Sequence, residues 1–316
     1  MIIDLPNTTT SKVSKKLVTI REEGGAVALG RVLTLIIATE LGSEEAAIEA
    51  ANDASREHPM RVIVLLTEPG NPDVEPRLDA QIRVGGDAGA SEVIVLRAYG
   101  AVASNEESLI TGLLLPDAPV VAWWPGRSPV TPASSPIGRI AQRRITDASA
   151  GEIPVEAVAS LSDSYRPGDT DFAWTRLTHW RAQLAAVLDQ APYEPVESVE
   201  VSGAADSPST VLLATWLRLR LQVPVKYKSH HRGNGSSGIH GVRLNRRSGA
   251  VVLERPIENV ATLSQPGQPT HDISLPRRSL RDCLAEELRR LGPDLMYGEV
   301  VTRGLKEFDT EVRSNG

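Results

Sequence analysis

Residues 31–67 read RVLTLIIATELGSEEAAIEAANDASREHPMRVIVLLT, and they predict the core of an α/β domain. Arg31–Thr39 and Arg61–Thr67 are almost continuously apolar, which is the pattern of strands buried on both faces. Between them a helix is expected to begin at Ser43, where a serine cap and acidic residues precede an alanine-rich stretch, and to end before Pro59. This order of strand, helix and strand predicts a parallel sheet covered by helices.

The rest of the N-terminal half extends the same pattern. Leu78–Val84 alternates between polar and apolar residues, which favours an edge or antiparallel position. Pro119–Trp124 reads PVVAWW and is a further buried strand. The sequence therefore predicts a doubly wound, mostly parallel sheet. Further helices are expected at Thr8–Glu23, Glu106–Leu115 and Ile153–Leu161, and further strands at Glu92–Arg97 and Arg144–Asp147.

A second domain is expected after a cluster of turn residues near 160–171. A chain of 316 residues is too long for one ordinary core, so we expect an N-terminal α/β domain at 1–165 and a C-terminal α+β domain at 166–316. In the second domain, Ser207–Leu221 reads as a helix with a serine cap and a proline at its first position. Strands are expected at Ser198–Ser202, Val223–Lys228, Gly241–Asn245, Ala250–Arg255, Ala261–Leu263 and His271–Leu275, and final helices at Ser279–Leu291 and Tyr297–Phe308.

The composition is typical of a soluble globular protein, with 41% apolar and 23% charged residues. A net charge of −6 argues against sequence-independent binding to nucleic acid, which needs a basic surface. The apolar runs are too short to span a membrane, and the N-terminal MIIDLPNTTT does not resemble a signal peptide. We therefore expect a cytoplasmic protein that binds neither nucleic acid nor membranes.

The sequence offers few residues arranged for catalysis. It contains no P-loop, no nucleophile elbow and no Gly-x-Gly-x-x-Gly between a strand and a helix. Gly233–Gly238 is among the nearest candidates, but its place before a strand favours a hairpin loop over a phosphate cradle. Cys283 is the single cysteine and lies on an apolar helical stripe, which predicts a buried thiol and excludes a cysteine-built metal site. We expect no cofactor and no metal.

The stretch Asp163–Gln190 reads DSYRPGDTDFAWTRLTHWRAQLAAVLDQ and brings acidic turn residues, tryptophans and arginines close together in sequence. Dense aromatic and arginine content suits a surface that contacts another protein. A capped amphipathic helix that buries its tryptophans in the core explains the same residues, and residue types alone favour that second interpretation. The candidate partner-binding side chains are Asp169, Asp171, Trp174, Arg176, Trp180 and Arg181.

The end of the strand at Pro119–Trp124 is the best candidate for a small-molecule pocket in the N-terminal half, because ligands of open parallel sheets bind beyond the carboxyl ends of strands. Trp123 and Trp124 must face opposite sides, so one belongs to the core and the other faces whatever covers the sheet. Ordinary packing explains both tryptophans. A structural ion pair with Asp147 explains Arg143 and Arg144 more simply than phosphate recognition does. The candidate ligand-binding residues are Trp124, Arg127, Arg143 and Arg144.

Several tracts carry a family likeness. They are PVVAWWPG from Pro119, RRITDAS from Arg143, YRPGDTDFAWTRLTHWRAQLAAVLDQ from Tyr165 and LPRRSLRDCLAEELRRLGPDLMYGE from Leu275. Together they resemble the OpcA family of glucose-6-phosphate dehydrogenase assembly proteins, and its actinobacterial branch most closely. GRVLTLIIAT and ASREHPMRVIVL are similar to the first strands of that family, so the likeness covers almost the entire chain. The tract from Asp169 to Trp180 is its most specific part.

The resemblance implies a non-catalytic partner that promotes the assembly or activation of glucose-6-phosphate dehydrogenase. Relatives in photosynthetic bacteria are linked to thioredoxin-dependent control through cysteines, but Cys283 alone cannot form a dithiol switch. An alternative of a different class is a sugar-phosphate- or nucleotide-binding enzyme that uses the Trp124 strand end with Arg143, Arg144 and Asp169. A third alternative is an activator that itself senses a small anion at that strand end.

Overall fold

The computed structural model describes residues 1–23, 32–67, 74–85, 92–191, 193–230 and 238–307. Its contacts divide the chain into two compact units. Unit 1 consists of Met1–Asp147, Gly168–Thr170 and Ser279–Pro293, and unit 2 consists of Ala148–Pro167, Asp171–Arg278 and Asp294–Gly316. Each unit is assembled from three segments, whereas the sequence predicts one boundary between residues 165 and 166. That boundary stays a prediction about how the chain divides into domains.

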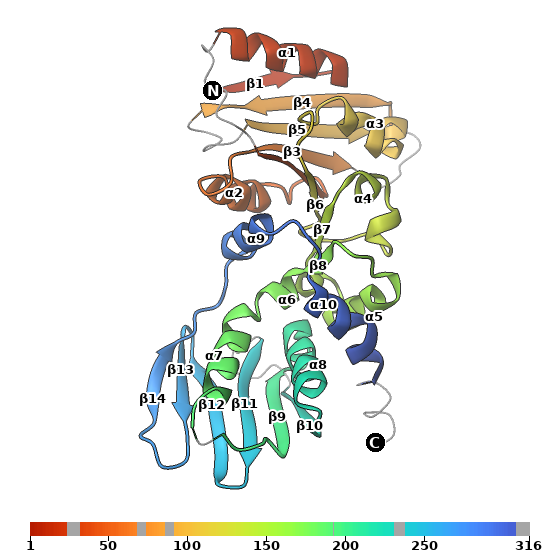
Figure 1. Cartoon of the computed structure of the whole chain (residues 1–316). Coiled ribbons are helices and arrows are strands. Elements are labelled where there is room, and N and C mark those ends of the chain that lie inside the picture. The colour runs from red at the N-terminus through yellow and green to blue at the C-terminus, as the bar shows by residue number, and fades with distance from the viewer. Residues whose placement is uncertain (24–31, 68–73, 86–91, 192, 231–237, 308–316) are drawn as a thin grey trace. The chain divides into compact units, whose positions relative to one another are not determined.

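Unit 1 is built on an eight-stranded sheet. Its strands are β1 (Ile2–Leu5), β2 (Leu33–Thr39), β3 (Met60–Thr67), β4 (Arg77–Arg83), β5 (Glu92–Tyr99), β6 (Val120–Trp123), β7 (Arg143–Thr146) and β8 (Asp169–Asp171). They lie in the order β1-β4-β5-β3-β2-β6-β7-β8 (Figure 1). The pairs among β5, β3, β2, β6 and β7 are parallel, and β4 is antiparallel to both of its neighbours. This order confirms the doubly wound sheet and the antiparallel place of β4, whereas β1 and β8 were not expected.

The helices of unit 1 complete its core. They are α1 (Thr10–Glu23), α2 (Glu45–Ala54), α3 (Glu106–Thr111), α4 (Pro136–Ile140) and α9 (Leu280–Arg289). α1 buries Val13, Leu17 and Ile20, which is the stripe that their spacing predicts. α9 comes from near the other end of the chain and packs against α2. Cys283 is fully buried in α9, as its apolar stripe predicts.

The order of the strands places a topological switch point between β2 and β6. From β2 the chain crosses through α2 to β3, and it later returns to the other side of β2 to form β6 and β7. In open α/β sheets, ligands bind at such a point, beyond the carboxyl ends of the strands. The two loops that matter for small-molecule binding in unit 1 are therefore those after Thr39 and after Trp123.

Unit 2 is built on a six-stranded sheet in which most strands form a meander. Its strands are β9 (Ser198–Ala204), β10 (Val225–His230), β11 (Ile239–Arg246), β12 (Gly249–Ile257), β13 (Val260–Ser264) and β14 (His271–Ser274). They lie in the order β10-β9-β11-β12-β13-β14 (Figure 1). β9 and β10 are parallel, and the remaining neighbours are antiparallel. The predicted α+β character and the meander are confirmed.

Helices complete the core of unit 2. They include α5 (Pro154–Ser164), α6 (Phe172–Thr175), α7 (Thr178–Leu188), α8 (Pro208–Leu221) and α10 (Leu295–Glu299). α8 packs against β9 and β10, and α5 and α6 pack against α8. α8 joins β9 to β10, and the side chain of Ser207 accepts the amide of Thr210, which confirms the predicted cap. Strand residues that face the helices, such as Val199 and Val201, are buried, whereas Glu200 on the other face pairs with exposed Lys228 at 2.7 Å.

The last helical segment contains a π-helical turn that the sequence does not predict. The sequence predicts a helix over roughly Tyr297–Phe308, and the chain is helical from Leu295 to Glu307, with α10 ending at Glu299 and the π-helical turn at Val300–Gly304. A Cβ on Gly304 would lie 2.6 Å from Cγ2 of Thr215 on α8, so the turn needs a glycine to lie this close to α8. Phe308 lies outside the described residues.

Candidate functional site

The two acidic residues of the predicted contact segment have different structural roles. In unit 1, the carboxylate of Asp169 forms an ion pair with the guanidinium of Arg144, which also donates to the carbonyl of Ala141 at 2.8 Å. Both charged side chains are at least nine-tenths buried. Gly168 precedes them with φ +100°, and a Cβ there would lie 2.4 Å from the carbonyl oxygen of Gln142. The sequence Pro-Gly-Asp thus lets β8 lie directly against β7.

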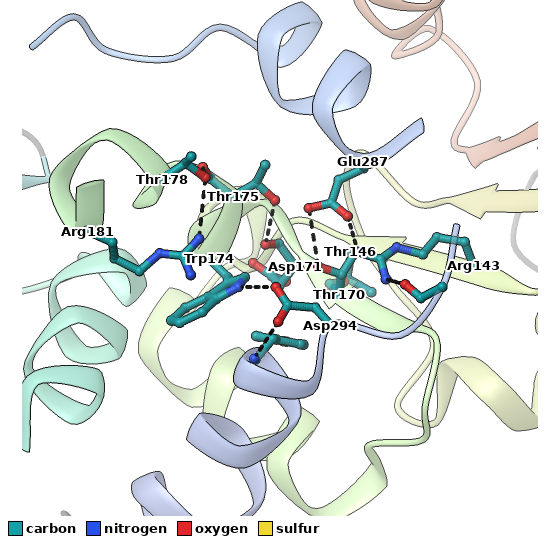
Figure 2. A network of polar contacts seen from close by, with 12 residues as sticks. Arg143, Thr146, Thr170, Asp171, Trp174, Thr175, Thr178, Arg181, Glu287 and Asp294 are labelled. Atoms are coloured by element: carbon teal, nitrogen blue, oxygen red, sulfur yellow. Dashed lines mark hydrogen bonds and ion pairs between the residues drawn. The ribbon is translucent and has the colours of Figure 1, made fainter. Parts of the chain in front are cut away.

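Arg143 forms a second buried ion pair in unit 1. Its guanidinium bonds the carboxylate of Glu287 on α9 and donates to the carbonyl of Gly292 at 2.8 Å (Figure 2). The hydroxyl of Thr170 donates to the same carboxylate at 3.4 Å. The charges of Arg143 and Arg144 are therefore each matched by a buried acid from a distant part of the chain. The arginines are therefore part of structural ion pairs, but their partners here are Glu287 and Asp169, whereas the sequence suggested the nearby Asp147.

Asp171 organises the start of α6 in unit 2. One carboxylate oxygen accepts the amide of Ala173 at 2.7 Å, and the other accepts the amide of Ala148 at 2.9 Å. The carboxylate is fully buried and serves as the N-cap of α6. Asp171 therefore caps a helix, as the turn residues of this segment predict. Because both oxygens are used, Asp171 is a structural residue.

Both tryptophans of the segment lie in the core of unit 2. Trp174 is 1% exposed, and its indole N–H donates to the carboxylate of Asp294 at 2.8 Å (Figure 2). Its ring lies 5.8 Å from that of Tyr297. Trp180 is 2% exposed, and the guanidinium of Arg255 lies 5.4 Å from its ring centre. These indoles are sealed from solvent, in agreement with the interpretation that residue types alone favour.

Burial limits which side chains of the segment Asp163–Gln190 can contact a partner protein. Asp169, Asp171, Trp174 and Trp180 cannot be touched by another protein in this conformation, because their side chains are buried. Arg176 and Arg181 are half-buried, and His179 between them is exposed. The guanidinium of Arg181 lies 3.8 Å from the ring centre of Trp174, and that of Arg176 lies 5.9 Å from the ring centre of Phe172. The buried aromatic rings thus support the arginines that reach the surface.

The candidate ligand residues at the β6 strand end do not form an open site. Trp123 and Trp124 are 0% and 4% exposed and occupy opposite sides of the strand, as alternation requires. The amide of Trp124 donates to the carbonyl of Ile145 at 2.9 Å. Arg127 is exposed, but Arg143 and Arg144 are buried in their ion pairs. The structure therefore does not bring Trp124, Arg127, Arg143 and Arg144 together around a pocket.

The other loop at the switch point is acidic. The carboxylate of Glu44 accepts the amide of Gly42 at 2.7 Å and lies 3.6 Å from the guanidinium of Arg97. Glu44 occupies the N-cap position of α2 but makes no side-chain cap bond, so the prediction of Ser43 as the cap is wrong. A dinucleotide-binding domain uses glycines and the amides of a helix N-terminus here to hold phosphate.

Acidic charge at the start of α2 is maintained by its neighbours. Arg83 donates to the carboxylate of Glu45 at 2.8 Å, and this hydrogen bond lowers the pKa of Glu45 below its ordinary value. Glu44 and Glu45 therefore present negative charge where a bound phosphate would need positive charge. The acid-rich tract ELGSEE signals the acidic start of α2 in the sequence, in addition to predicting where the helix begins.

Among the described residues, no group of three or more histidine, cysteine or acidic side chains is placed to hold a metal ion. No helix in the described part of the chain is both long and apolar enough to cross a membrane.

A cavity of about 380 Å³ lies at the end of α8, lined in part by Arg218, Gln222 and Arg303. Arg303 is paired with Glu299 and Glu307 at 3.1 and 3.5 Å, so most of the charge at this cavity is balanced within the chain.

Comparison with known proteins identifies both halves of the chain. Residues 51–163 match the family model described as the glucose-6-phosphate dehydrogenase subunit N-terminal domain, and residues 167–301 match the one described as its C-terminal domain. The two models carry the names OpcA_G6PD_assem and OpcA_G6PD_C, respectively. No curated protein matches the chain significantly.

Several solved structures of low sequence identity also match the chain. An oxidoreductase from Sinorhizobium meliloti superposes with a TM-score of 0.51 at 11% identity, covering 89% of this chain and 97% of its own. Glucose-6-phosphate 1-dehydrogenase from Mycobacterium avium gives a TM-score of 0.47 at 9% identity, covering 89% and 92%. A Gfo/Idh/MocA family oxidoreductase from Vibrio cholerae gives 0.38 at 10% identity, covering 89% and 99%. The first of these similarities supports the α/β fold and carries no information on activity.

Proposed function

Because the chain belongs to the OpcA family of glucose-6-phosphate dehydrogenase assembly proteins, we propose that it is a non-catalytic activator that binds this dehydrogenase. The observation that carries the proposal is the pair of family matches, which together extend from residue 51 to residue 301. We further propose that it acts in the cytoplasm, on the entry step of the oxidative pentose phosphate pathway.

The chemistry of the switch point supports a role without catalysis. An α/β oxidoreductase holds its dinucleotide with helix N-terminal amides, and here the Gly42 amide donates to Glu44. A phosphate brought to this loop would meet the carboxylates of Glu44 and Glu45, which already pair with Arg97 and Arg83 and so leave it little positive charge. The acidic residues at this loop therefore support a role without catalysis.

The alternative of a sugar-phosphate- or nucleotide-binding enzyme receives no support from the arginines on which it was based. Arg143 pairs with Glu287, and Arg144 pairs with Asp169. Opening either pair to a ligand would leave a buried carboxylate without its counter-ion, which costs about 3–5 kcal/mol. A sugar phosphate would have to compensate for that loss before it bound with any affinity.

An activator of this kind works by binding one state of the enzyme more tightly than another. A tenfold change in the apparent affinity of the dehydrogenase for its substrate needs a coupling free energy of only about 1.4 kcal/mol. A few well-supported side chains at an interface supply that much. Large conformational change within the activator is therefore not required.

We propose that the surface beside α6 and α7 provides part of the contact, through Arg176, His179 and Arg181. Arg176 and Arg181 lie over buried aromatic rings, which restricts their motion and lowers the entropy lost on binding. The buried members of the segment then act indirectly, because Trp174 supports Arg181 from below. This assignment replaces direct contact by the tryptophans.

The proposal is tested by titrating purified dehydrogenase with the purified chain and measuring the rate of NADP reduction. We expect the rate at subsaturating glucose 6-phosphate to rise to a plateau at a fixed molar ratio. The chain alone should produce no turnover. Turnover by the chain alone, or an unchanged rate at micromolar concentrations of both proteins, would refute the proposal.

A further inference from the structure

One face of the second sheet points away from the core of unit 2. In β9, Val199 and Val201 are buried in that core, and Glu200 between them is not. The pairing of the strands places Glu200 beside Lys226 of β10 and beside Arg243 of β11, and both of these side chains are exposed. Glu200, Lys226 and Arg243 therefore share one face of the sheet, which we call the outer face.

One row of paired residues crosses the outer face from edge to edge. It contains one residue from each of the six strands, in the order in which the strands lie in Figure 1. Its members are Lys228, Ser202, Gly241, Glu254, Thr262 and Asp272. The row begins with a base on β10 and ends with an acid on β14.

The outer face has a basic half and an acidic half. On β10, β9 and β11, three bases and one acid leave an excess of positive charge; they are Lys226, Lys228, Arg243 and Glu200. On β12, β13 and β14, the described side chains of the outer face include two acids, Glu254 and Asp272, and no base. Arg255 of β12 does not belong to this face, because its guanidinium lies against buried Trp180.

Four of these charges have no ionic partner within the described part of the chain. Lys228 and Glu200 pair with each other at 2.7 Å, but no ion pair joins Lys226, Arg243, Glu254 or Asp272 to a described residue. Nε of Arg243 donates to the side chain of Asn245 at 3.1 Å, which leaves the charge of the arginine unmatched. The unmatched charges are thus positive in one half and negative in the other.

The outer face also carries accessible apolar side chains on β12 and β13. Val252 pairs with Arg243, and Ile257 pairs with Val260, which alternates with the buried Ala261. Among the described residues, the apolar side chains that form or contact the core of unit 2 include none of Val252, Ile257 and Val260. Ile257 is 67% exposed. An apolar strip between charged edges is the anatomy of a protein interface.

We propose that the outer face binds the outer face of a second copy of this chain, so that the two sheets stack around a two-fold axis parallel to the strands. Such an axis reverses the order of the strands in the second copy, and β10 of each copy then lies over β14 of the other. Lys226 and Lys228 therefore approach Asp272 of the second copy, and the same contact recurs on the other side of the axis. An axis across the strands would instead place β10 over β10, where like charges repel.

The same arrangement brings the apolar strips together. β11 and β12 are the middle strands of the six, so the axis passes between them and the two β12 strands lie next to each other. Val252 and Ile257 then meet the second copy close to their own counterparts. Six strands about 4.8 Å apart make a face about 24 Å wide, which is small for a specific interface. We therefore expect a dimer that forms at micromolar concentration and dissociates on dilution.

The competing explanation is a solvated sheet face, which one side of an antiparallel sheet often is. That explanation accounts for the alternation along the strands and predicts a monomer. It assigns no role to the exposed Ile257 or to the division of the charges. The oligomeric state of the chain therefore separates the two explanations.

The dimer is independent of the proposed function. α7 buries Trp180 in the core of unit 2 together with Val199, and Val199 points away from the outer face. The surface beside α6 and α7 that is proposed to contact the dehydrogenase therefore stays accessible in the dimer.

The test is sedimentation equilibrium of the purified full chain, without the dehydrogenase, over a wide range of concentration around the micromolar level. The mass of the wild-type chain should rise from that of one chain towards that of two, and sodium chloride should weaken the association because it screens exposed charges. Lys226→Glu and Asp272→Lys should each weaken it about tenfold or more, since both edge contacts then join like charges. Both side chains are exposed, so the fold should be retained, and circular dichroism checks this.

A mixture of the two variants gives the sharpest result. In a dimer of one Lys226→Glu chain and one Asp272→Lys chain, each edge contact joins opposite charges again, so the mixture should associate about as tightly as the wild type. Arg220→Glu makes the same charge change as Lys226→Glu at an exposed position of α8, outside the outer face, and should dimerise as the wild type does.

A wild-type chain with the mass of one chain at every concentration would overturn the proposal, and so would a mixture that associates no better than the single variants. If the chain stays monomeric and both variants lose binding to the dehydrogenase, the outer face belongs to the enzyme and the proposal is also overturned. Because the sedimentation samples contain no dehydrogenase, they leave the proposed function to its own test.

Discussion

The guanidinium carbon of Arg181 lies 3.8 Å from the ring centre of Trp174, so a half-buried arginine covers one face of a core indole. The edge of the same indole donates its N–H to Asp294, whose other carboxylate oxygen caps α10 by accepting the amide of Tyr297 at 3.0 Å. One tryptophan therefore joins α6, α7 and the start of α10 within unit 2. The aromatic and arginine residues that suggest a contact surface in the sequence therefore stabilise the fold of unit 2.

Trp174→Phe should lower the free energy of unfolding by about 1–3 kcal/mol, because the carboxylate of Asp294 loses a donor in a partly buried place. Urea denaturation followed by circular dichroism measures the change. Trp216→Phe on α8 is the matched control, because Trp216 is only half-buried, and it should cost less. Equal losses for the two variants would contradict the role assigned to Trp174.

Glu287→Gln should destabilise the chain by about 3–5 kcal/mol, because it leaves the charge of Arg143 buried without a counter-ion. The double variant Arg143→Met with Glu287→Leu should recover most of this loss, since neither charge of this pair then remains. Glu107→Gln is the control, because its pair with Arg139 is exposed and is worth about 1 kcal/mol or less. A double variant as unstable as the single one would show that the pair does not act as a unit.

Arg176→Glu should weaken binding of the dehydrogenase at least about tenfold, because it reverses a charge at the centre of the proposed contact. The fold should be retained, since Arg176 is half-buried and its 3.2 Å hydrogen bond to Ser149 lies at the surface. Surface plasmon resonance against immobilised dehydrogenase measures the affinity. Arg220→Glu, at an exposed arginine of α8, makes the same charge change away from this surface and should bind normally. Equal affinities of the two variants would place the contact elsewhere.

The pair of Glu45 with Arg83 predicts a pH dependence. The pKa of Glu45 in the folded chain is lower than its ordinary value of 4.5, chiefly through the hydrogen bond from Arg83. Its stabilising effect is therefore complete above pH 4.5 and disappears as the pH falls through the lower folded-state pKa. Glu45→Gln should be less stable than the wild type at pH 7 and indistinguishable from it in acid. A difference that persists in acid would rule out the ion pair as its cause.

The sequence predicts the framework of both sheets because the strands of the core are apolar and the turns carry their own chemistry. β2, β3 and β6 are recognised from continuous apolar runs, and the capping roles of Ser207 and Asp171 follow from local geometry. Cys283 is buried because its helical stripe is apolar. Each of these features depends on residues close together in the chain.

The features that escaped prediction depend on residues far apart. β8 reads Asp-Thr-Asp, which is a turn sequence, and its place in the sheet depends on the pairing of Asp169 with Arg144 and on the contact of Thr170 with Glu287. Aromatic and arginine residues occur together both in interfaces and over buried rings, so composition cannot place Trp174 and Trp180.

The central claim is that this chain influences a reaction by binding another protein. Its most direct test is sedimentation velocity of the purified chain and the purified dehydrogenase, separately and mixed at micromolar concentration, with enzyme activity measured on the same samples. We predict a faster-sedimenting species that contains both proteins and whose amount rises with activity. Unchanged sedimentation of both components, with activity also unchanged, would contradict the account.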